Sequence, residues 1–140
     1  MMRAHRNLGG GGWLLVLLVV VGCASPVQPD RVPKDKPFDL HIGESALTTD
    51  DVRIRFDTVR SDSRCPADVQ CVRAGEAVIA VTLSRPGEAG VGRELETTPA
   101  RSSTAFLNFT ITLTSLQPYP RTDRQTRTED YVGTFVVTLR

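Results

Sequence analysis

From Phe38 onward, apolar residues recur at every second position in several short runs, and this period limits what the chain can form. Phe38, Leu40 and Ile42 alternate with polar residues, and a similar alternation runs over residues 52–58. Successive side chains of a β-strand point to opposite faces, so such runs predict strands with one buried face. No stretch after Cys23 shows the 3.6-residue apolar repeat of an amphipathic helix. The chain is therefore predicted to be all-β.

Six to eight short strands separated by loops predict an antiparallel β-sandwich, immunoglobulin-like or fibronectin-like, over residues 38–140. A small closed barrel is the alternative. The phrase Leu113-Thr-Ser-Leu-Gln-Pro ahead of Tyr131 resembles the corner before strand F of fibronectin-type domains. The expected strands are residues 38–42, 46–47, 52–58, 77–83, 94–98, 105–113 and 131–139.

The longest alternation places Ala105, Leu107 and Phe109 on one face and predicts a single strand. The segments between strands carry turn formers and charges, which favour loops. Loops are expected at residues 60–74, 84–92 and 121–130.

The first residues have the layout of a secretory signal. Arg3 and Arg6 precede an apolar run at residues 13–21, which ends in Gly22 and Cys23. As a helix this run would span only about 15 Å, roughly half the hydrocarbon core of a bilayer. A permanent transmembrane helix is therefore not expected.

Val20-Val21-Gly22-Cys23 resembles the lipobox of bacterial lipoproteins. The resemblance implies that residues 1–22 are a signal peptide removed before Cys23, and that Cys23 carries a diacylglycerol thioether and an acylated amino group. It also implies a cell-envelope protein held to a membrane by lipid and facing the periplasm or exterior. Ala24 instead of Asp after the cysteine resembles cargo of the outer membrane, if the host has one.

Residues 23–37 are predicted to be a linker between this anchor and the domain. Four prolines among charged residues favour extended polyproline geometry: Pro26, Pro29, Pro33 and Pro37. Without Arg3 and Arg6, 15 basic residues face 16 acidic ones, so the remaining chain is nearly neutral. Such a chain lacks the basic field that nucleic-acid binding needs, and no nucleic-acid partner is expected.

If Cys23 is used by lipid, Cys65 and Cys71 remain as a pair, and an oxidising envelope favours a disulfide between them. The alternative is a metal or redox site, but the spacing matches neither pattern and no histidine lies near. The segments Asp62-Ser-Arg-Cys-Pro and Gln70-Cys-Val-Arg-Ala-Gly-Glu-Ala resemble a motif of small exported bacterial proteins of unknown function, in which Trp usually stands at the position of Arg73.

No catalytic residue, metal site or cofactor is predicted. His41 is the only histidine after Cys23 and is expected on an outward strand position. Several acidic residues could serve glycoside hydrolysis or calcium binding, but they are expected at turns and solvated edges. These acids are Asp50, Asp51, Asp57, Glu94, Glu96, Glu129 and Asp130.

Arg60, Arg64 and Arg73 are the candidate binding residues, for an anionic ligand or a partner. With Arg53, Arg55 and nearby aspartates they are otherwise expected to form a solvated, mixed-charge surface. The preferred hypothesis is a non-enzymatic, lipid-anchored module that binds a protein or cell-wall component through the loops at 84–92 and 121–130. The alternatives are an enzyme inhibitor of the envelope, such as a protease inhibitor, and a hydrolase with an unrecognised site.

Overall fold

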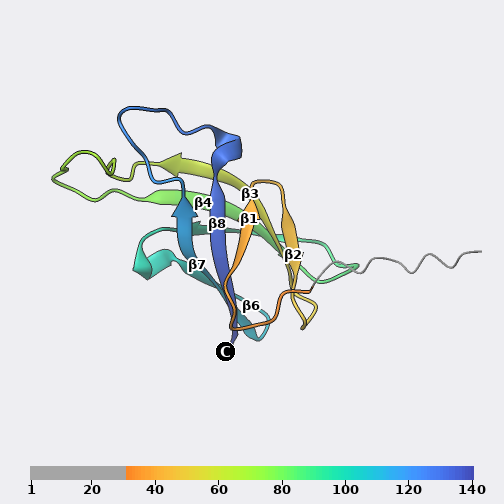
Figure 1. Cartoon of the computed structure of the whole chain (residues 1–140). Coiled ribbons are helices and arrows are strands. Elements are labelled where there is room, and N and C mark those ends of the chain that lie inside the picture. Colours follow the sequence, from red (N-terminus) through yellow and green to blue (C-terminus); the bar gives the residue numbers. More distant parts are fainter. Residues whose placement is uncertain (1–30) are drawn as a thin grey trace, which may run out of the picture.

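The computed structural model describes residues 31–140, so the expected signal peptide, Cys23 and the first part of the linker lie outside it. Within this part, eight strands form two four-stranded antiparallel sheets, which confirms the predicted all-β sandwich (Figure 1). The strands are β1 (Phe38–His41), β2 (Ser45–Leu47), β3 (Arg53–Asp62), β4 (Ala77–Ser84), β5 (Val91–Glu96), β6 (Ser103–Phe106), β7 (Phe109–Gln117) and β8 (Val132–Leu139). Two short 3-10 helices, η1 (Pro99–Arg101) and η2 (Thr128–Asp130), lie in connections.

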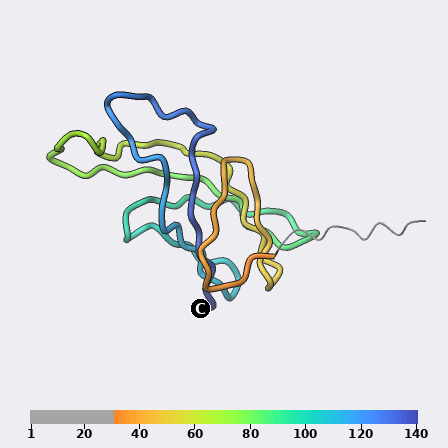
Figure 2. Tube along the Cα trace, in the orientation of Figure 1, coloured from red at the N-terminus to blue at the C-terminus, as the bar shows by residue number. Residues whose placement is uncertain are grey.

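The strand order is that of a meander. One sheet has the order β2-β3-β4-β5 and the other has the order β1-β8-β7-β6. Strands that pair within a sheet are therefore consecutive in sequence, except that β1 pairs with β8 (Figure 2). The chain passes from one sheet to the other between β1 and β2 and again between β5 and β6. Immunoglobulin-type domains reach two sheets by Greek-key connections, so this connectivity differs from theirs.

The core lies between the two sheets and comes from the alternating apolar positions of the strands. Phe56 of β3 meets Phe135 of β8 edge to face, with ring centroids 5.9 Å apart. Both rings are fully buried, and such pairs stabilise a core beyond their area alone. The other buried core residues are Leu40, Val52, Ile54, Ala77, Ile79, Val81, Leu83, Leu95, Phe109, Ile111, Leu113, Leu116, Tyr131 and Val137.

The single strand predicted over residues 105–113 is wrong. The chain turns back at Leu107 and Asn108, and β6 pairs antiparallel with β7 from Phe106 opposite Phe109. Leu107 has a φ of 53° and is exposed, so its apolar side chain does not continue the buried face. The unbroken alternation of apolar residues concealed a two-residue hairpin turn, the shortest connection between antiparallel strands.

The predicted linker ends at residue 37, but residues before that boundary already contact the folded domain. Val32 donates its N–H to Leu47 O, and Thr49 donates back to Val32 O. Asp35 donates to Val137 O on β8. Residues 32–35 therefore pack as part of the folded domain.

The two ends of the sandwich carry different connections. Arg31 pairs with Asp51 at 2.6 Å, and both lie beside the β4–β5 loop at residues 85–88. We call this the entry end, because the described chain begins there. The β3–β4 connection (residues 63–76, the cysteine loop) and the β7–β8 connection (residues 118–131) lie at the opposite end, which we call the loop end (Figure 1).

Candidate functional site

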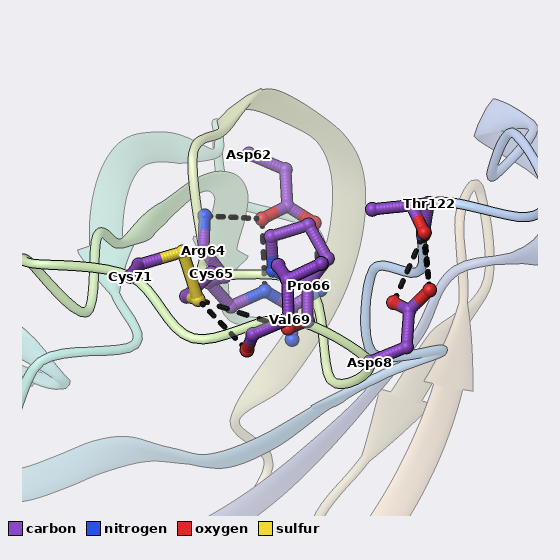
Figure 3. Close-up of a disulfide and its surroundings, with 8 residues drawn as sticks. All are labelled: Asp62, Arg64, Cys65, Pro66, Asp68, Val69, Cys71 and Thr122. Carbon is purple, nitrogen blue, oxygen red and sulfur yellow. Dashed lines mark hydrogen bonds and ion pairs between the residues drawn. A yellow bond between two sulfur atoms is a disulfide. The ribbon is translucent and has the colours of Figure 1, made fainter.

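The cysteine loop is closed by a short covalent bridge. The sulfur atoms of Cys65 and Cys71 lie at disulfide distance, 2.10 Å apart, with their Cα atoms 5.9 Å apart (Figure 3). The predicted pairing of these cysteines is therefore confirmed. The bridge links Cys65, which lies shortly after the end of β3, to Cys71 in the middle of the loop.

The base of the cysteine loop is a two-strand extension of the β3–β4 hairpin. Ser63 donates its N–H to Glu76 O at 2.8 Å, and Cys65 donates to Ala74 O at 2.7 Å. Gly75 sits between them with a φ of 65°, and a Cβ there would lie 1.8 Å from Ser63 O. Only glycine fits this position, because the positive φ and the close backbone approach both exclude a side chain.

Arg64 anchors the cysteine loop to the opposite sheet. Its guanidinium is held by the Asp62 carboxylate through two hydrogen bonds, from Nε at 2.8 Å and from Nη2 at 2.6 Å. Nη1 donates to Leu116 O at 2.7 Å, and Nη2 also donates to Pro118 O at 3.0 Å. Buried charge is tolerated when it is paired and its donors are bonded, as they are here.

Burial and pairing set the protonation of the groups around Arg64. Burial alone would raise the pKa of Asp62, but the hydrogen bonds from Arg64, its positive charge and the hydrogen bond from Tyr131 outweigh burial and hold the pKa below its usual value. Burial, together with donation to the Asp62 carboxylate at 3.0 Å, raises the pKa of the Tyr131 phenol. Asp62 is thus an ion and Tyr131 a neutral donor at neutral pH.

A second set of contacts joins the cysteine loop to the β7–β8 connection. Ala67 donates its N–H to Pro120 O at 2.9 Å. The Asp68 carboxylate accepts hydrogen bonds from the N–H and the hydroxyl of Thr122 (Figure 3). These two hydrogen bonds hold the pKa of Asp68 below its usual value. Two loops that are more than fifty residues apart in sequence therefore form one connected surface.

The outer part of this surface presents apolar side chains to solvent. Val72 follows Cys71 and is 104% exposed, so nothing in the domain covers it. Val69 and Tyr119 are 47% and 43% exposed. The ring of Tyr119 lies against Arg64, with the guanidinium carbon 4.8 Å from the ring centroid. The loop end thus combines a fixed backbone with an exposed apolar tip, which we define as Val69, Val72 and Tyr119.

A groove of about 380 Å³ opens beside the cysteine loop. One wall is the last part of β7 with Tyr119, and the other is the connection between β5 and η1 with Ala74 and Gly75. The groove is lined by Arg64, Ala74, Gly75, Thr97, Thr98, Pro99, Leu113, Thr114, Ser115, Leu116, Gln117 and Tyr119.

The three predicted binding arginines do not share one environment. The expectation that Arg64 belongs to a solvated surface is wrong, since the residue is 6% exposed and its charge is paired with Asp62. Arg60 is exposed on β3 and lies 3.7 Å from Glu94, whereas Arg73 is exposed on the cysteine loop. Sequence could have indicated the pair, because Asp62 and Arg64 are two residues apart, the spacing of one face of a strand.

The acids considered for catalysis are mostly paired with arginines or bonded locally. Asp51 binds Arg31, Asp57 binds Arg55 at 2.9 Å, and Glu129 binds Arg127. His41 ends β1 in an exposed position, as predicted. Within residues 31–140, no three His, Cys, Asp or Glu side chains are placed to share a metal ion, and no helix is long and apolar enough to cross a bilayer.

Comparison with known proteins gives no relative for this chain: no family model, curated protein or solved structure matches it.

Proposed function

We propose that the protein is a non-enzymatic module of the cell envelope, anchored by lipid at Cys23, that binds a protein or cell-wall partner through the apolar tip of the loop end. The observation that carries this proposal is the exposure of Val72 on a loop whose base is held by backbone hydrogen bonds and by the Cys65–Cys71 bridge. The outer membrane is the favoured location if the host has one, because Ala24 follows the lipid-bearing cysteine.

The rigidity of the loop end favours binding. The disulfide, the Arg64 ion pair and the contacts of Asp68 with Thr122 fix the backbone before any partner arrives. A surface ordered in advance loses less conformational entropy on association, so more of its contact energy appears as affinity. Tyrosine is enriched among the residues that dominate binding energy at interfaces, and Tyr119 supplies one at the tip, while Val72 adds exposed apolar area.

The position of the tip also favours the tip, and not the loop at residues 84–92, as the binding surface. That loop lies at the entry end, beside Arg31, whereas the tip lies at the far end of β3. Ten strand residues span about 33 Å. If the chain is tied to a membrane at Cys23, the tip is directed away from the anchor and the 84–92 loop is on the anchor side. The predicted role of the 84–92 loop is therefore replaced by the cysteine loop and residues 118–131.

The test is site-specific photo-crosslinking in intact cells of the host. A photoreactive amino acid at Val72 is expected to give a discrete crosslinked species, and the same amino acid at Leu107 is expected to give none. Leu107 is a matched control because it is also an exposed apolar residue, 51% exposed, but lies on the β6–β7 turn, away from the loop end. Equal crosslinking at both positions, or none at Val72, contradicts the proposal.

An enzyme inhibitor is the second candidate, and the shape of the tip favours it. Val72 and Arg73 are exposed and directly follow Cys71 of the disulfide, and an exposed segment of this kind can enter a protease cleft. Incubation of the purified protein with serine proteases of elastase and trypsin specificity tests this alternative. Slow cleavage confined to the Val72 or Arg73 bond, with inhibition of the protease, supports it, and rapid digestion rejects it.

A further inference from the structure

We infer that the groove beside the cysteine loop is a binding site for an uncharged saccharide. The inference goes beyond the proposed function, because it concerns the groove and not the exposed side chain of Val72. Tyr119 is the one residue that belongs to both the tip and the groove, and the groove needs no lipid anchor. It rests on three properties of the groove, namely its charge, its polar groups and its aromatic wall.

The groove offers a ligand almost no net charge. Arg64 is the only charged residue among those that line it, and the Asp62 carboxylate lies 2.6 Å from its Nη2. Four of the five guanidinium N–H groups donate to Asp62, Leu116 O and Pro118 O. An anion in the groove would therefore find its expected partner already neutralised and bonded, so the ligand is expected to be uncharged.

The polar groups of the groove are hydroxyls and an amide, which suit a ligand rich in hydroxyls. Three of them are oriented by the protein itself. Thr97 accepts from the N–H of Ala77 at 3.0 Å, Thr98 donates to Glu96 at 3.1 Å, and Thr114 donates to Thr134 O at 3.1 Å. A hydroxyl that uses one of these bonds still has lone pairs, or a proton, for a ligand.

Ser115 and Gln117 add a second line of polar groups along the wall formed by β7. Ser115 is half-buried and Gln117 is exposed. The Gln117 side chain can both donate and accept, so it can hold a sugar hydroxyl in either role. Polar groups placed on two facing walls give a ligand its orientation.

The apolar part of the groove suits the C–H face of a sugar ring. Leu113 and Leu116 line the groove but are only 4% and 3% exposed, so its accessible apolar surface comes mainly from the Tyr119 ring, which is 43% exposed. The Arg64 guanidinium packs against this ring, with its carbon 4.8 Å from the ring centroid, which favours a fixed orientation of the ring. An amphipathic ring of this kind packs an apolar face while its hydroxyl stays in water. The volume of about 380 Å³ lies near the lower bound of small-molecule sites, roughly 300–1,000 Å³, and would hold one or two sugar rings.

The test is an NMR titration of the purified full-length protein, labelled with nitrogen-15 in detergent micelles. The probes are N,N′-diacetylchitobiose, maltose and cellobiose, each at millimolar concentration. We expect at least one of them to shift the backbone amides of Thr98, Ser115 and Gln117 in a saturable manner. The amide of Leu107, at the other end of the sandwich, is expected to stay unchanged.

Three variants separate a groove site from general loosening of the loop. Tyr119→Ala is expected to weaken binding about tenfold, equivalent to about 1.4 kcal/mol, and Tyr119→Phe to retain most of it. Gln117→Leu, at an exposed position, removes the amide without touching the Arg64 cluster and is also expected to weaken binding several-fold. Leu107→Ala is the matched control and leaves the affinity unchanged.

Two further probes define what overturns the inference. A blocked alanine tripeptide that shifts the same amides more strongly than every saccharide would assign the groove to peptides. Digalacturonate binding more tightly than the neutral sugars would contradict the charge argument. Absence of groove shifts with all three neutral probes rejects the inference. Crosslinking at Val72 is measured separately, so either proposal can fail while the other stands.

Discussion

Arg64 brings a positive charge into the interior of a nearly neutral domain, where its partners decide its effect on stability. Asp62 supplies the countercharge, and the carbonyls of Leu116 and Pro118 satisfy further donors. Lysine could keep the charge, but it lacks the planar fork that reaches all three partners at once. The geometry, and not the charge alone, therefore holds the two loops together.

Arg64→Ala is expected to lower the free energy of unfolding by about 3–5 kcal/mol, because it leaves the Asp62 carboxylate buried without its partner. Arg64→Lys is expected to cost nearly as much. Urea denaturation of the purified protein measures both. Arg60→Ala is the control, since the side chain of Arg60 is 61% exposed, and it should shift the unfolding midpoint very little. A Lys variant as stable as wild type would show that the fork geometry is unimportant.

Asp62 also makes stability depend on pH. Its pKa is lower in the folded protein than the ordinary value of 3.8, so the folded state favours the carboxylate. The resulting stabilisation is complete above the unfolded pKa and is lost as the pH falls through the folded pKa. We expect the urea concentration at the unfolding midpoint to decrease as the pH is lowered below about 4. The decrease is expected to be smaller in Asp62→Asn, although that variant is less stable than wild type at neutral pH. Equal slopes in the two proteins would exclude Asp62 as a source of the dependence.

At the scale of the element, the cysteine loop extends the β3–β4 hairpin by a covalent bridge and a backbone ladder. Cys65→Ser combined with Cys71→Ser is expected to lower the free energy of unfolding by about 2 kcal/mol, because the bridge restrains a short loop of the unfolded chain. Thermal unfolding with and without reductant measures it. Reductant should destabilise the wild type and leave the double variant unchanged. A reductant effect on the double variant would mean that other thiol chemistry is involved.

The β6–β7 turn offers a prediction of opposite sign. Leu107 adopts a φ of 53°, where a residue with a side chain costs about 1–2 kcal/mol and glycine does not. Leu107→Gly is therefore expected to raise the free energy of unfolding by up to about 1 kcal/mol after the greater flexibility of glycine in the unfolded chain is subtracted. Urea denaturation checks this, with Leu139→Gly, at another exposed leucine, expected to destabilise.

The same turn shows why element boundaries were harder to predict than the fold class. Alternation determines which residues share a face, and it correctly predicted the inward positions of Leu40, Ile54 and Phe56. It cannot distinguish one long strand from a tight hairpin whose turn residue is also apolar, as Leu107 is. Asn108, a residue common in turns, was the only local signal of the reversal.

At the scale of the whole molecule, the site depends on contacts that no local pattern encodes. Arg64 reaches Leu116 across 52 residues of sequence, and Asp68 reaches Thr122 across 54. The disulfide could be predicted because two cysteines have few alternatives. The burial of Arg64 could not, since a lone arginine in a polar loop is ordinarily solvated. The groove exists only because β5 and β7, from different sheets, come together beside this loop.

If Cys23 carries the proposed lipid anchor, the arrangement of the two ends has a consequence for binding. The chain enters the sandwich at Arg31, and the apolar tip lies at the other end of β3. Residues 24–30 add a reach of about 20 Å when extended. A partner at a fixed height above the membrane would therefore contact the tip only if the linker holds the domain at a matching distance from the membrane.

Cys23→Ala is expected to abolish lipid attachment and leave an uncleaved precursor, visible as a higher polypeptide mass without fatty acid. Deletion of residues 24–30 is expected to keep the lipid but to reduce crosslinking from Val72, because the tip is drawn toward the membrane. Cell fractionation and the crosslinking experiment measure the two effects independently. Replacement of residues 24–30 by a Gly-Ser segment of equal length is the control and should keep most of the crosslink. A deletion variant that crosslinks like wild type would place the partner at the membrane surface instead, and an unlipidated wild type would remove the anchor from the proposal.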